Sequence, residues 1–286
     1  MSALISISGL NKAYGKKQVL KNINLTVEPG QIIGLVGPNG AGKTTCLQAL
    51  LGLTGYQGNI RVLGHNPAKD RAKMLESVAY ISDVAVLPKW IKVSQLMSYM
   101  QGVHPKFDAE KAHTLLAKTN IPLNAKVKTL SKGMVTQLHL ALILAVDAKV
   151  LVLDEPTLGL DILTRRQFYS HLLENFHNDH RCIVITTHQI EEIEHILTHV
   201  AFIRDGEIVI DESVEGVRCR FKLLTVANEN IAAASALQPV FSNQLMGLTS
   251  MLFDDGDLNE LQSLGEVSSP SLADVFVGIM SKEKGQ

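Results

Sequence analysis

An α/β fold is predicted by three observations in the 286-residue sequence. Residues 32–36 form a continuous apolar run, a glycine-rich loop follows at 37–44, and a helical pattern begins at residue 45. Two further short apolar runs, residues 149–153 and 182–187, each lead into charged or titratable side chains. Such runs are typical of strands that are buried on both faces of a parallel or mixed sheet. Ligands are expected at the carboxyl ends of these strands.

The N-terminal part of the chain has a different pattern. Residues 4–7 and 18–27 mix apolar and polar positions in short β-like runs, and between them lies a loop that holds Tyr14 and Gly15. Strands with one apolar face are typical of antiparallel pairs, so we expect an antiparallel β subdomain. The ring of Tyr14 could stack on an adenine base, and an exposed tyrosine without that role fits the same position.

The glycine-rich loop matches the pattern G-x-x-x-x-G-K-[ST] at every fixed position. Its residues are Gly37, Pro38, Asn39, Gly40, Ala41, Gly42, Lys43 and Thr44, with Thr45 next. The glycines allow successive N–H groups to surround one anion. Lys43 adds a positive charge toward the β- and γ-phosphates, and Thr44 offers a hydroxyl to Mg²⁺. The alternative is a turn with an incidental lysine, but a strand before the loop and a helix after it favour a phosphate site.

Polar side chains at three other strand ends could complete this site. The two apolar runs named above are followed by Asp154 and Glu155 and by His188, and a shorter run is followed by Asp83. Two adjacent carboxylates are costly at a strand end unless a cation neutralises them. In a nucleotide site Asp154 would hold the Mg²⁺ shell and Glu155 would accept a proton from the attacking water. An acidic turn and a solvated histidine are the structural alternatives.

The remaining pattern predicts a helical subdomain and a C-terminal appendage. Apolar residues recur three and four positions apart in the region of residues 84–148, which favours helices inserted into the α/β core. We expect one nucleotide-binding domain over residues 1–212 and a small α+β accessory region over residues 213–286. Within that region, the alternation at 217–223 predicts a strand, and Ser271-x-x-Asp274 predicts the start of a last helix.

The bulk composition constrains the partners of the chain. With 27 basic and 28 acidic residues the formal net charge is −1, so no electrostatic attraction to nucleic acid or lipid is indicated. The longest strongly apolar helical segment, residues 138–146, is far shorter than the roughly 20 residues that span a bilayer. No signal-peptide pattern is present, and the three cysteines lack the spacing of a disulfide framework or metal site. We expect a cytoplasmic protein that reaches a membrane only through a partner.

Taken in order, these motifs resemble the nucleotide-binding subunits of ABC transporters over roughly residues 3–212. Tyr14 matches the family's adenine-stacking aromatic residue, and residues 37–45 match its P-loop. Leu130-Ser131-Lys132-Gly133-Met134 matches the signature, which usually reads Leu-Ser-Gly-Gly-Gln. Residues 150–155 match the strand with the magnesium aspartate and the catalytic glutamate, residues 158–161 match the D-loop, and His188 matches the switch histidine.

The resemblance implies a P-loop ATPase that works as a head-to-tail dimer, either with a second copy or with another ABC ATPase chain. Each ATP, with Mg²⁺, would lie between one chain's P-loop and Ser131 and Gly133 of the other. Asp161 would couple the two sites, Glu155 would polarise water, and His188 would contact the γ-phosphate. The implied partners are separate integral membrane permease subunits on the cytoplasmic face of the membrane, and nucleic acid is not among them.

Two departures from the usual family pattern concern the contact with the permease and the signature sequence. Asp83 stands where the family usually has a glutamine that touches Mg²⁺ and the permease, and an ionised carboxylate cannot donate a hydrogen bond. Lys132 and Met134 replace a glycine and a glutamine of the signature. This signature, with the Ser-Leu-x-Asp-Val-Phe pattern at 271–276, resembles the branch that serves drug, antibiotic and peptide exporters.

Two other functions remain open from the sequence. A soluble ABC-type ATPase acting on DNA or ribosomes would share the motifs, although the chain has neither a long coiled-coil insertion nor a second nucleotide domain. A slowly hydrolysing nucleotide switch is suggested by Asp83 and by the altered signature, while Glu155 and His188 favour hydrolysis.

Overall fold

A six-stranded mixed sheet forms the centre of the computed structural model, which describes residues 2–82, 87–245 and 247–281. Its strand order is β5-β6-β7-β3-β8-β9. The strands are β3 (Ile32–Val36), β5 (Val78–Ile81), β6 (Val150–Asp154), β7 (Cys182–Thr187), β8 (His199–Arg204) and β9 (Glu207–Ser213). Neighbours from β5 to β8 are parallel, and β9 pairs antiparallel with β8. The predicted mixed sheet is confirmed.

The two faces of this sheet pack into two different cores, because successive side chains of a strand point to opposite faces. In β6, Val150 and Val152 pack toward the N-terminal sheet and helix α1 (Lys43–Leu50). Leu151 and Leu153 pack on the other face, in the core that includes residues of helix α6 (Ile162–Phe176). Burial on both faces explains why the central strands are apolar throughout.

The N-terminal sheet is antiparallel and has the order β2-β1-β4. Its strands are β1 (Ile5–Tyr14), β2 (Lys17–Val27) and β4 (Gln57–Val62), and the short helix α2 (Arg71–Leu75) follows. The prediction that Tyr14 lies on a loop is wrong. Tyr14 pairs with Lys17 in the β1–β2 ladder, so the connection is a tight turn of Gly15 and Lys16. The strands extend further because Gly15, with φ of 58°, allows a turn this short.

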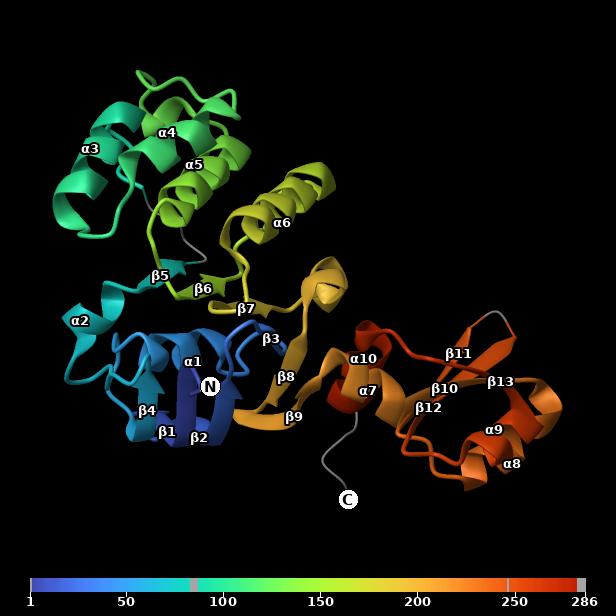
Figure 1. The fold of residues 1–286 in the computed structure, drawn as a ribbon. Helices are drawn as coiled ribbons and strands as arrows, with labels where there is room; N and C mark the ends of the chain where they lie inside the picture. The colour runs from blue at the N-terminus through green and yellow to red at the C-terminus, as the bar shows by residue number, and fades with distance from the viewer. Residues whose placement is uncertain (1, 83–86, 246, 282–286) are drawn as a thin grey trace.

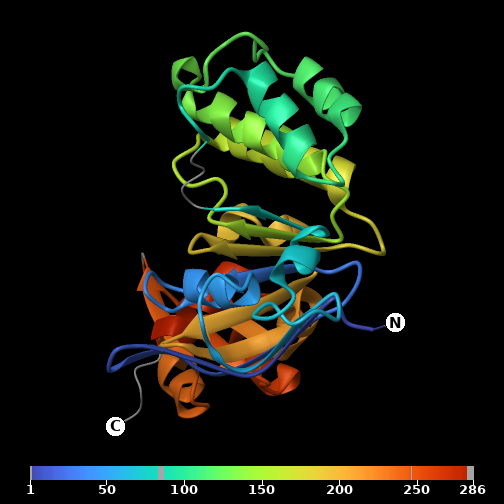
Figure 2. The same cartoon turned by 90° about the vertical axis from the view of Figure 1, so that its left-hand side faces the viewer.

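A separate group of helices lies beyond the central sheet, on the side opposite the N-terminal sheet (Figures 1 and 2). It comprises α3 (Val93–Val103), α4 (Ala109–Ala117), the 3₁₀ turn η1 (Val127–Thr129) and α5 (Lys132–Leu144), and it has its own apolar cluster. The helix of the signature begins at Lys132. In the part of the chain that the structure describes, no helix combines the length and hydropathy needed to cross a membrane.

The C-terminal region forms a four-stranded sheet of order β11-β12-β10-β13, to the right of β8 and β9 in Figure 1. The elements that lead to it are the 3₁₀ turns η2 (Ile190–Glu192) and η3 (Glu194–Ile196) and helix α7 (Val214–Arg220). The region continues with β10 (Phe221–Val226), η4 (Asn228–Asn230), α8 (Ile231–Ala236), β11 (Phe241–Leu245), β12 (Leu248–Asp254), α9 (Leu258–Leu264), β13 (Gly265–Ser268) and α10 (Leu272–Ser281).

The strand predicted over residues 217–223 is wrong in its first half. Residues up to Arg220 form α7, and the strand begins at Phe221. The Ser213 hydroxyl caps α7 by accepting a hydrogen bond from the N–H of Gly216 at 3.0 Å. Arg218 and Arg220 in its last turn stabilise the helix, because their positive charges interact favourably with the negative end of the helix dipole. These local signals outweighed a short alternation of apolar residues.

The last helix returns to the central sheet. Leu272 and Val275 belong to the same apolar core as β8. The rings of Phe276 and Phe202 meet edge to face with centroids 5.3 Å apart. Arg204 donates a hydrogen bond to the carbonyl of Ile279 at 2.6 Å. The capping pattern predicted at the start of this helix is confirmed, since the N–H of residue 274 donates to the Ser271 hydroxyl at 3.1 Å.

Candidate nucleotide site

The phosphate-binding loop connects the end of β3 to the start of α1. Gly42 is the N-cap of α1 and has φ of 110°, a region that favours glycine. A Cβ at Gly37 would lie only 2.4 Å from the carbonyl oxygen of Ile203. The loop thus needs glycine at one position for its dihedral angle and at another for space. The N–H groups that open α1 are well placed for an anion.

Lys43 is buried beneath this loop, with only 6% of its surface exposed. Its ammonium group donates to the carbonyl oxygens of Gly37 at 2.7 Å and Pro38 at 3.3 Å. It also lies 3.5 Å from a carboxylate oxygen of Glu155. Because a buried ammonium requires such partners, the loop conformation and the charge stabilise each other.

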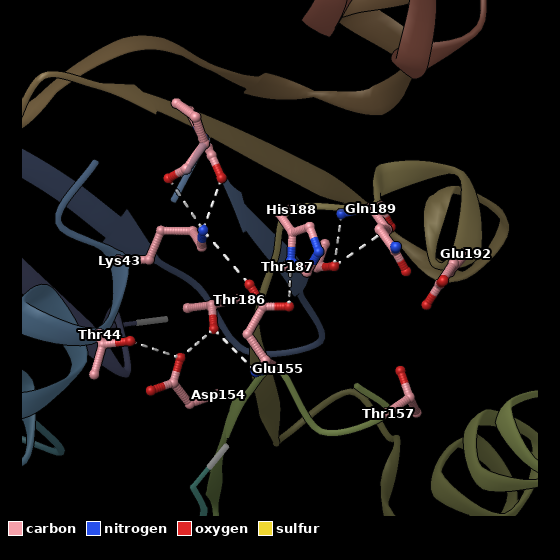
Figure 3. Close-up of polar contacts among 12 residues, drawn as sticks. Lys43, Thr44, Asp154, Glu155, Thr157, Thr186, Thr187, His188, Gln189 and Glu192 are labelled. Atoms are coloured by element: carbon pink, nitrogen blue, oxygen red, sulfur yellow. Dashed lines mark hydrogen bonds and ion pairs between the residues drawn. The ribbon is translucent and has the colours of Figure 1, made fainter. Parts of the chain in front are cut away.

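Asp154, at the end of β6, joins two hydroxyl groups from different elements (Figure 3). One of its oxygens accepts from the Thr44 hydroxyl at 3.2 Å and from the Thr186 hydroxyl at 2.5 Å. Asp154 and Thr186 are register partners in the parallel pair of β6 and β7, so the sheet itself sets this contact. Thr186 was not among the residues predicted for this site. Its hydroxyl near the end of a largely apolar strand is the feature of the sequence that could have indicated it.

Glu155 follows directly and has φ of 47°, which is unusual for a residue other than glycine. Its N–H donates to the carbonyl oxygen and the hydroxyl of Thr186, both at 3.2 Å. Its second carboxylate oxygen lies 2.9 Å from Nδ1 of His188. The carboxylate therefore lies between Lys43 and His188, as Figure 3 shows. A strained backbone at such a position is typical of a functional site.

The loop, Glu155 and His188 line one open cavity of about 590 Å³. Its lining residues are Lys17, Val19, Asn39, Gly40, Gly42, Lys43, Thr44, Thr45, Glu155, Leu158 and His188. Lys17 and Val19 were not predicted from the sequence, and Leu158 was predicted as part of the D-loop but not as a residue of this cavity. A second cavity of about 590 Å³ lies beside the β1–β2 hairpin, but its lining includes no residue of the phosphate-binding loop. The side chains suited to binding phosphate or accepting a proton, Lys43, Thr44, Glu155 and His188, therefore line the first cavity.

Among the predicted site residues that the structure describes, Gly37, Pro38, Ala41 and Asp154 lie next to lining residues without lining the cavity themselves. Tyr14, Ser131, Gly133 and Asp161 do not line it either. Tyr14 is 49% exposed, and the ammonium group of Lys12 lies 4.6 Å from its ring centroid. Asp83 lies outside the described residues.

Ser131 and Asp161 instead cap two neighbouring helices. The Ser131 hydroxyl accepts from the N–H of Met134 at 3.2 Å at the start of α5. Asp161 accepts from the N–H and the hydroxyl of Thr164 at 3.0 and 2.7 Å at the start of α6. The Thr164 hydrogen bonds lower the pKa of Asp161 below its ordinary value. The polar side chains of Ser131 and Asp161 are thus both engaged in capping helices, although Leu158 of the D-loop does line the cavity.

No group of three or more His, Cys, Asp or Glu side chains that could hold a metal ion occurs within the described ranges. Mg²⁺ in nucleotide sites needs few protein ligands, because phosphate oxygens and waters supply the rest. Thr44 and Asp154 offer two hard oxygen donors that already point toward each other. These residues fit a magnesium ion that arrives with a nucleotide.

Comparison with known proteins identifies the family. The sequence pattern of the family described as ABC transporter matches residues 20–158. An uncharacterised ABC transporter ATP-binding protein of Bacillus subtilis, YdbJ, is 32% identical over 216 residues, covering 74% of this chain and 70% of that protein. The Nod factor export ATP-binding protein I of Cupriavidus metallidurans is 33% identical over 222 residues, covering 74% and 71%. The lantibiotic transport ATP-binding protein SrtF of Streptococcus pyogenes is 28% identical and covers 85% and 98%.

Solved structures support the same fold. An ATP-binding subunit of an ABC transporter superposes with a TM-score of 0.70 at 22% identity, covering 76% of this chain and 92% of that one. CbiO1 from Clostridium perfringens gives 0.66 at 23% identity, covering 83% and 96%. Together with the fold and the P-loop cavity, these similarities show that the chain belongs to the ABC transporter ATP-binding proteins, the ATPase subunits whose hydrolysis of ATP drives transport.

Proposed function

We propose that the cavity binds ATP with its phosphates on residues 37–45 and hydrolyses it with Lys43, Glu155 and His188. The contacts within this triad carry the proposal: Glu155 lies 3.5 Å from the Lys43 ammonium and 2.9 Å from His188 Nδ1, all three lining one cavity. Glu155 would take a proton from water, and His188 would steady the γ-phosphate. Lys43 would neutralise charge that develops as the phosphoryl group leaves.

Mg²⁺ would be held by the Thr44 hydroxyl and the Asp154 carboxylate, and it would neutralise phosphate charge when bound. The Thr186 hydroxyl holds Asp154 in the orientation that faces Thr44. An additional role of Asp83 in the metal shell stays a prediction.

The working unit would be a head-to-tail dimer with a second copy or another ABC ATPase chain. Ser131 and Gly133 lie outside the cavity of their own chain, which supports a role at the nucleotide of the partner chain. The N-terminus of α5 would then present its free N–H groups to the γ-phosphate. Asp161 would couple the two sites, and Tyr14 would stack on adenine from the β1–β2 hairpin.

The transported cargo would move outward through separate permease subunits. Relatives named for Nod factor export and lantibiotic transport support an exporter. The permease would dock on the helical subdomain, about residues 84–148, near Trp90, whose side chain is 73% exposed. The chain would thus lie at the cytoplasmic face of the membrane without nucleic-acid partners. Residues 1–212 would form the ATPase domain and residues 213–286 the accessory region.

Substitution of the proposed base tests this function. Glu155→Gln should slow steady-state phosphate release by about 10²- to 10⁴-fold, the usual contribution of a general base. ATP affinity, measured by nucleotide titration, should be retained. Glu191→Gln is the matched control, because Glu191 is exposed on η2 close to the site. Near-wild-type turnover of Glu155→Gln would overturn the assignment.

Substitution of the P-loop lysine tests the phosphate site separately. Lys43→Ala removes a buried charge that holds two loop carbonyls, and ATP binding should be lost in the same titration. An unchanged affinity would contradict the placement of the phosphates on residues 37–45.

A further inference from the structure

Arg165, on the first turn of α6, contacts both segments that flank the proposed catalytic groups. Its Nε donates to the carbonyl of Leu160 at 2.9 Å, and one terminal nitrogen donates to the side-chain oxygen of Gln189 at 3.4 Å. The guanidinium also forms an ion pair with Glu192. Arg165 is thus hydrogen-bonded on one side to the D-loop and on the other side to the segment that follows β7.

The D-loop side of this connection starts at Glu155. The Thr157 hydroxyl hydrogen-bonds the phenol of Tyr169 at 3.1 Å, and burial raises the pKa of that phenol to about 12. Thr157 is thereby fixed to α6 two residues after the proposed base. Three residues later the buried Leu160 presents its carbonyl to Arg165. Both ends of the loop are therefore tied to α6.

The other side of the connection starts at His188. Gln189 is the next residue, and its N–H donates to the Thr187 hydroxyl at 2.9 Å. Glu192 lies on η2 one turn later, and Figure 3 places its side chain with that of Gln189 on the same short segment. The Arg165 and Glu192 side chains are only 21% and 19% exposed. Loss of either partner would leave a poorly solvated charge unpaired, so this ion pair fixes the segment after His188 firmly.

We propose that Arg165 is a positioning residue for ATP hydrolysis, which holds His188 in register with Glu155 by joining the D-loop to the segment after β7. The inference rests on the proposed role of His188. The planar guanidinium directs Nε to the Leu160 carbonyl and one terminal nitrogen to both the Gln189 side chain and the Glu192 carboxylate. A lysine has one donor atom, so it could keep the ion pair but not the bond to Leu160 as well.

Through Arg165, a movement of the D-loop would also be transmitted to His188. Asp161, next to Leu160, is exposed at the start of α6. A displacement of the D-loop by a partner chain would pull on the same guanidinium that holds Gln189, and hence on the backbone of His188.

The test compares steady-state phosphate release by full-length variants. Arg165→Ala should lower kcat by about 10- to 100-fold, as expected from a displacement of catalytic groups on the order of 1 Å. KM and the ATP affinity should change by less than about 3-fold, because Arg165 does not line the cavity. Arg165→Lys should give an intermediate kcat. Arg166→Ala, an exposed neighbour on the same helix, should retain wild-type turnover.

A double-mutant cycle with His188→Ala separates positioning from a merely structural effect. If Arg165 acts through His188, Arg165→Ala should cost less than about 2-fold once His188 is absent. An unchanged kcat in Arg165→Ala, or the same loss with and without His188, would overturn the inference. If His188→Ala alone has wild-type turnover, the proposed role of His188 fails first, and the inference fails with it. Should Arg165→Ala not fold, Glu192→Gln in the same cycle tests the other end of the ion pair.

Discussion

Thr186 gives the sharpest test of how the site is built. Its hydroxyl is fully buried, donates to Asp154 at 2.5 Å and accepts from the N–H of Glu155 at 3.2 Å. Thr186→Val removes the hydroxyl while keeping the shape of the side chain. A hydrogen bond to a charged group contributes about 1.5–3 kcal/mol. Since Asp154 is only 1% exposed and solvent cannot replace the lost donor, the variant should unfold at lower urea, with a free energy of unfolding reduced by about that amount.

The neighbouring Thr187 is the matched control. It is also buried, and within the described residues its hydroxyl exchanges hydrogen bonds with the backbone of Gln189, at 2.9 and 3.4 Å. Thr187→Val should therefore cost about 0.5–1.5 kcal/mol, the range for neutral hydrogen bonds. Magnesium-dependent ATP affinity should fall in Thr186→Val and not in the control. Equal losses of stability in the two variants would refute the reasoning that the charge of Asp154 dominates this contact.

Two further predictions concern the loop and a buried histidine. Gly42→Ala should weaken ATP affinity more than Gly40→Ala in nucleotide titration, because a Cβ at residue 42 would lie 2.7 Å from Leu20, whereas nothing lies within 4 Å of one at residue 40. Equal losses would show that only the positive φ of both glycines matters. Burial lowers the pKa of His139 from 6.5 to about 4. Above pH 6.5 this group has no effect, but between pH 6.5 and 4 only the unfolded chain binds the proton, so stability falls by about 1.4 kcal/mol per pH unit. Urea midpoints at pH 7.5 and 5 should lie closer together in His139→Gln than in the wild type, and an unchanged separation would contradict this origin.

Much of the fold followed from local patterns in the sequence. The strand at Cys182–Thr187 has the predicted bounds. Its signal is strong, because the run is almost entirely apolar. The error at residues 217–223 arose where the apolar alternation was short and a serine cap competed with it.

The site was predictable as far as its residues lie in contiguous motifs. Thr44, Asp154, Glu155 and His188 come together because parallel strands deliver their ends to one edge of the sheet. Thr186 was not predictable in the same way, since its role depends on which strand lies beside β6, and that register is a property of the assembled sheet. Arg165 was hidden for a similar reason. Leu160 lies 5 positions before Arg165, and Gln189 and Glu192 lie 24 and 27 positions after it. No local sequence pattern relates these partners.

The return of α10 to the central sheet has a consequence for synthesis of the protein. Leu272 and Val275 fill the same core as Phe202 of β8 and Ile210 of β9. Once residues up to 212 have been synthesised, every proposed catalytic group is therefore present, but Leu272 and Val275, which complete the apolar core on this face, are not. The part of the core that they cover stays exposed while the C-terminal region is translated, and exposed apolar surface favours association with chaperones or with other chains. Completion of the core on this face thus depends on residues that are made after every proposed catalytic group.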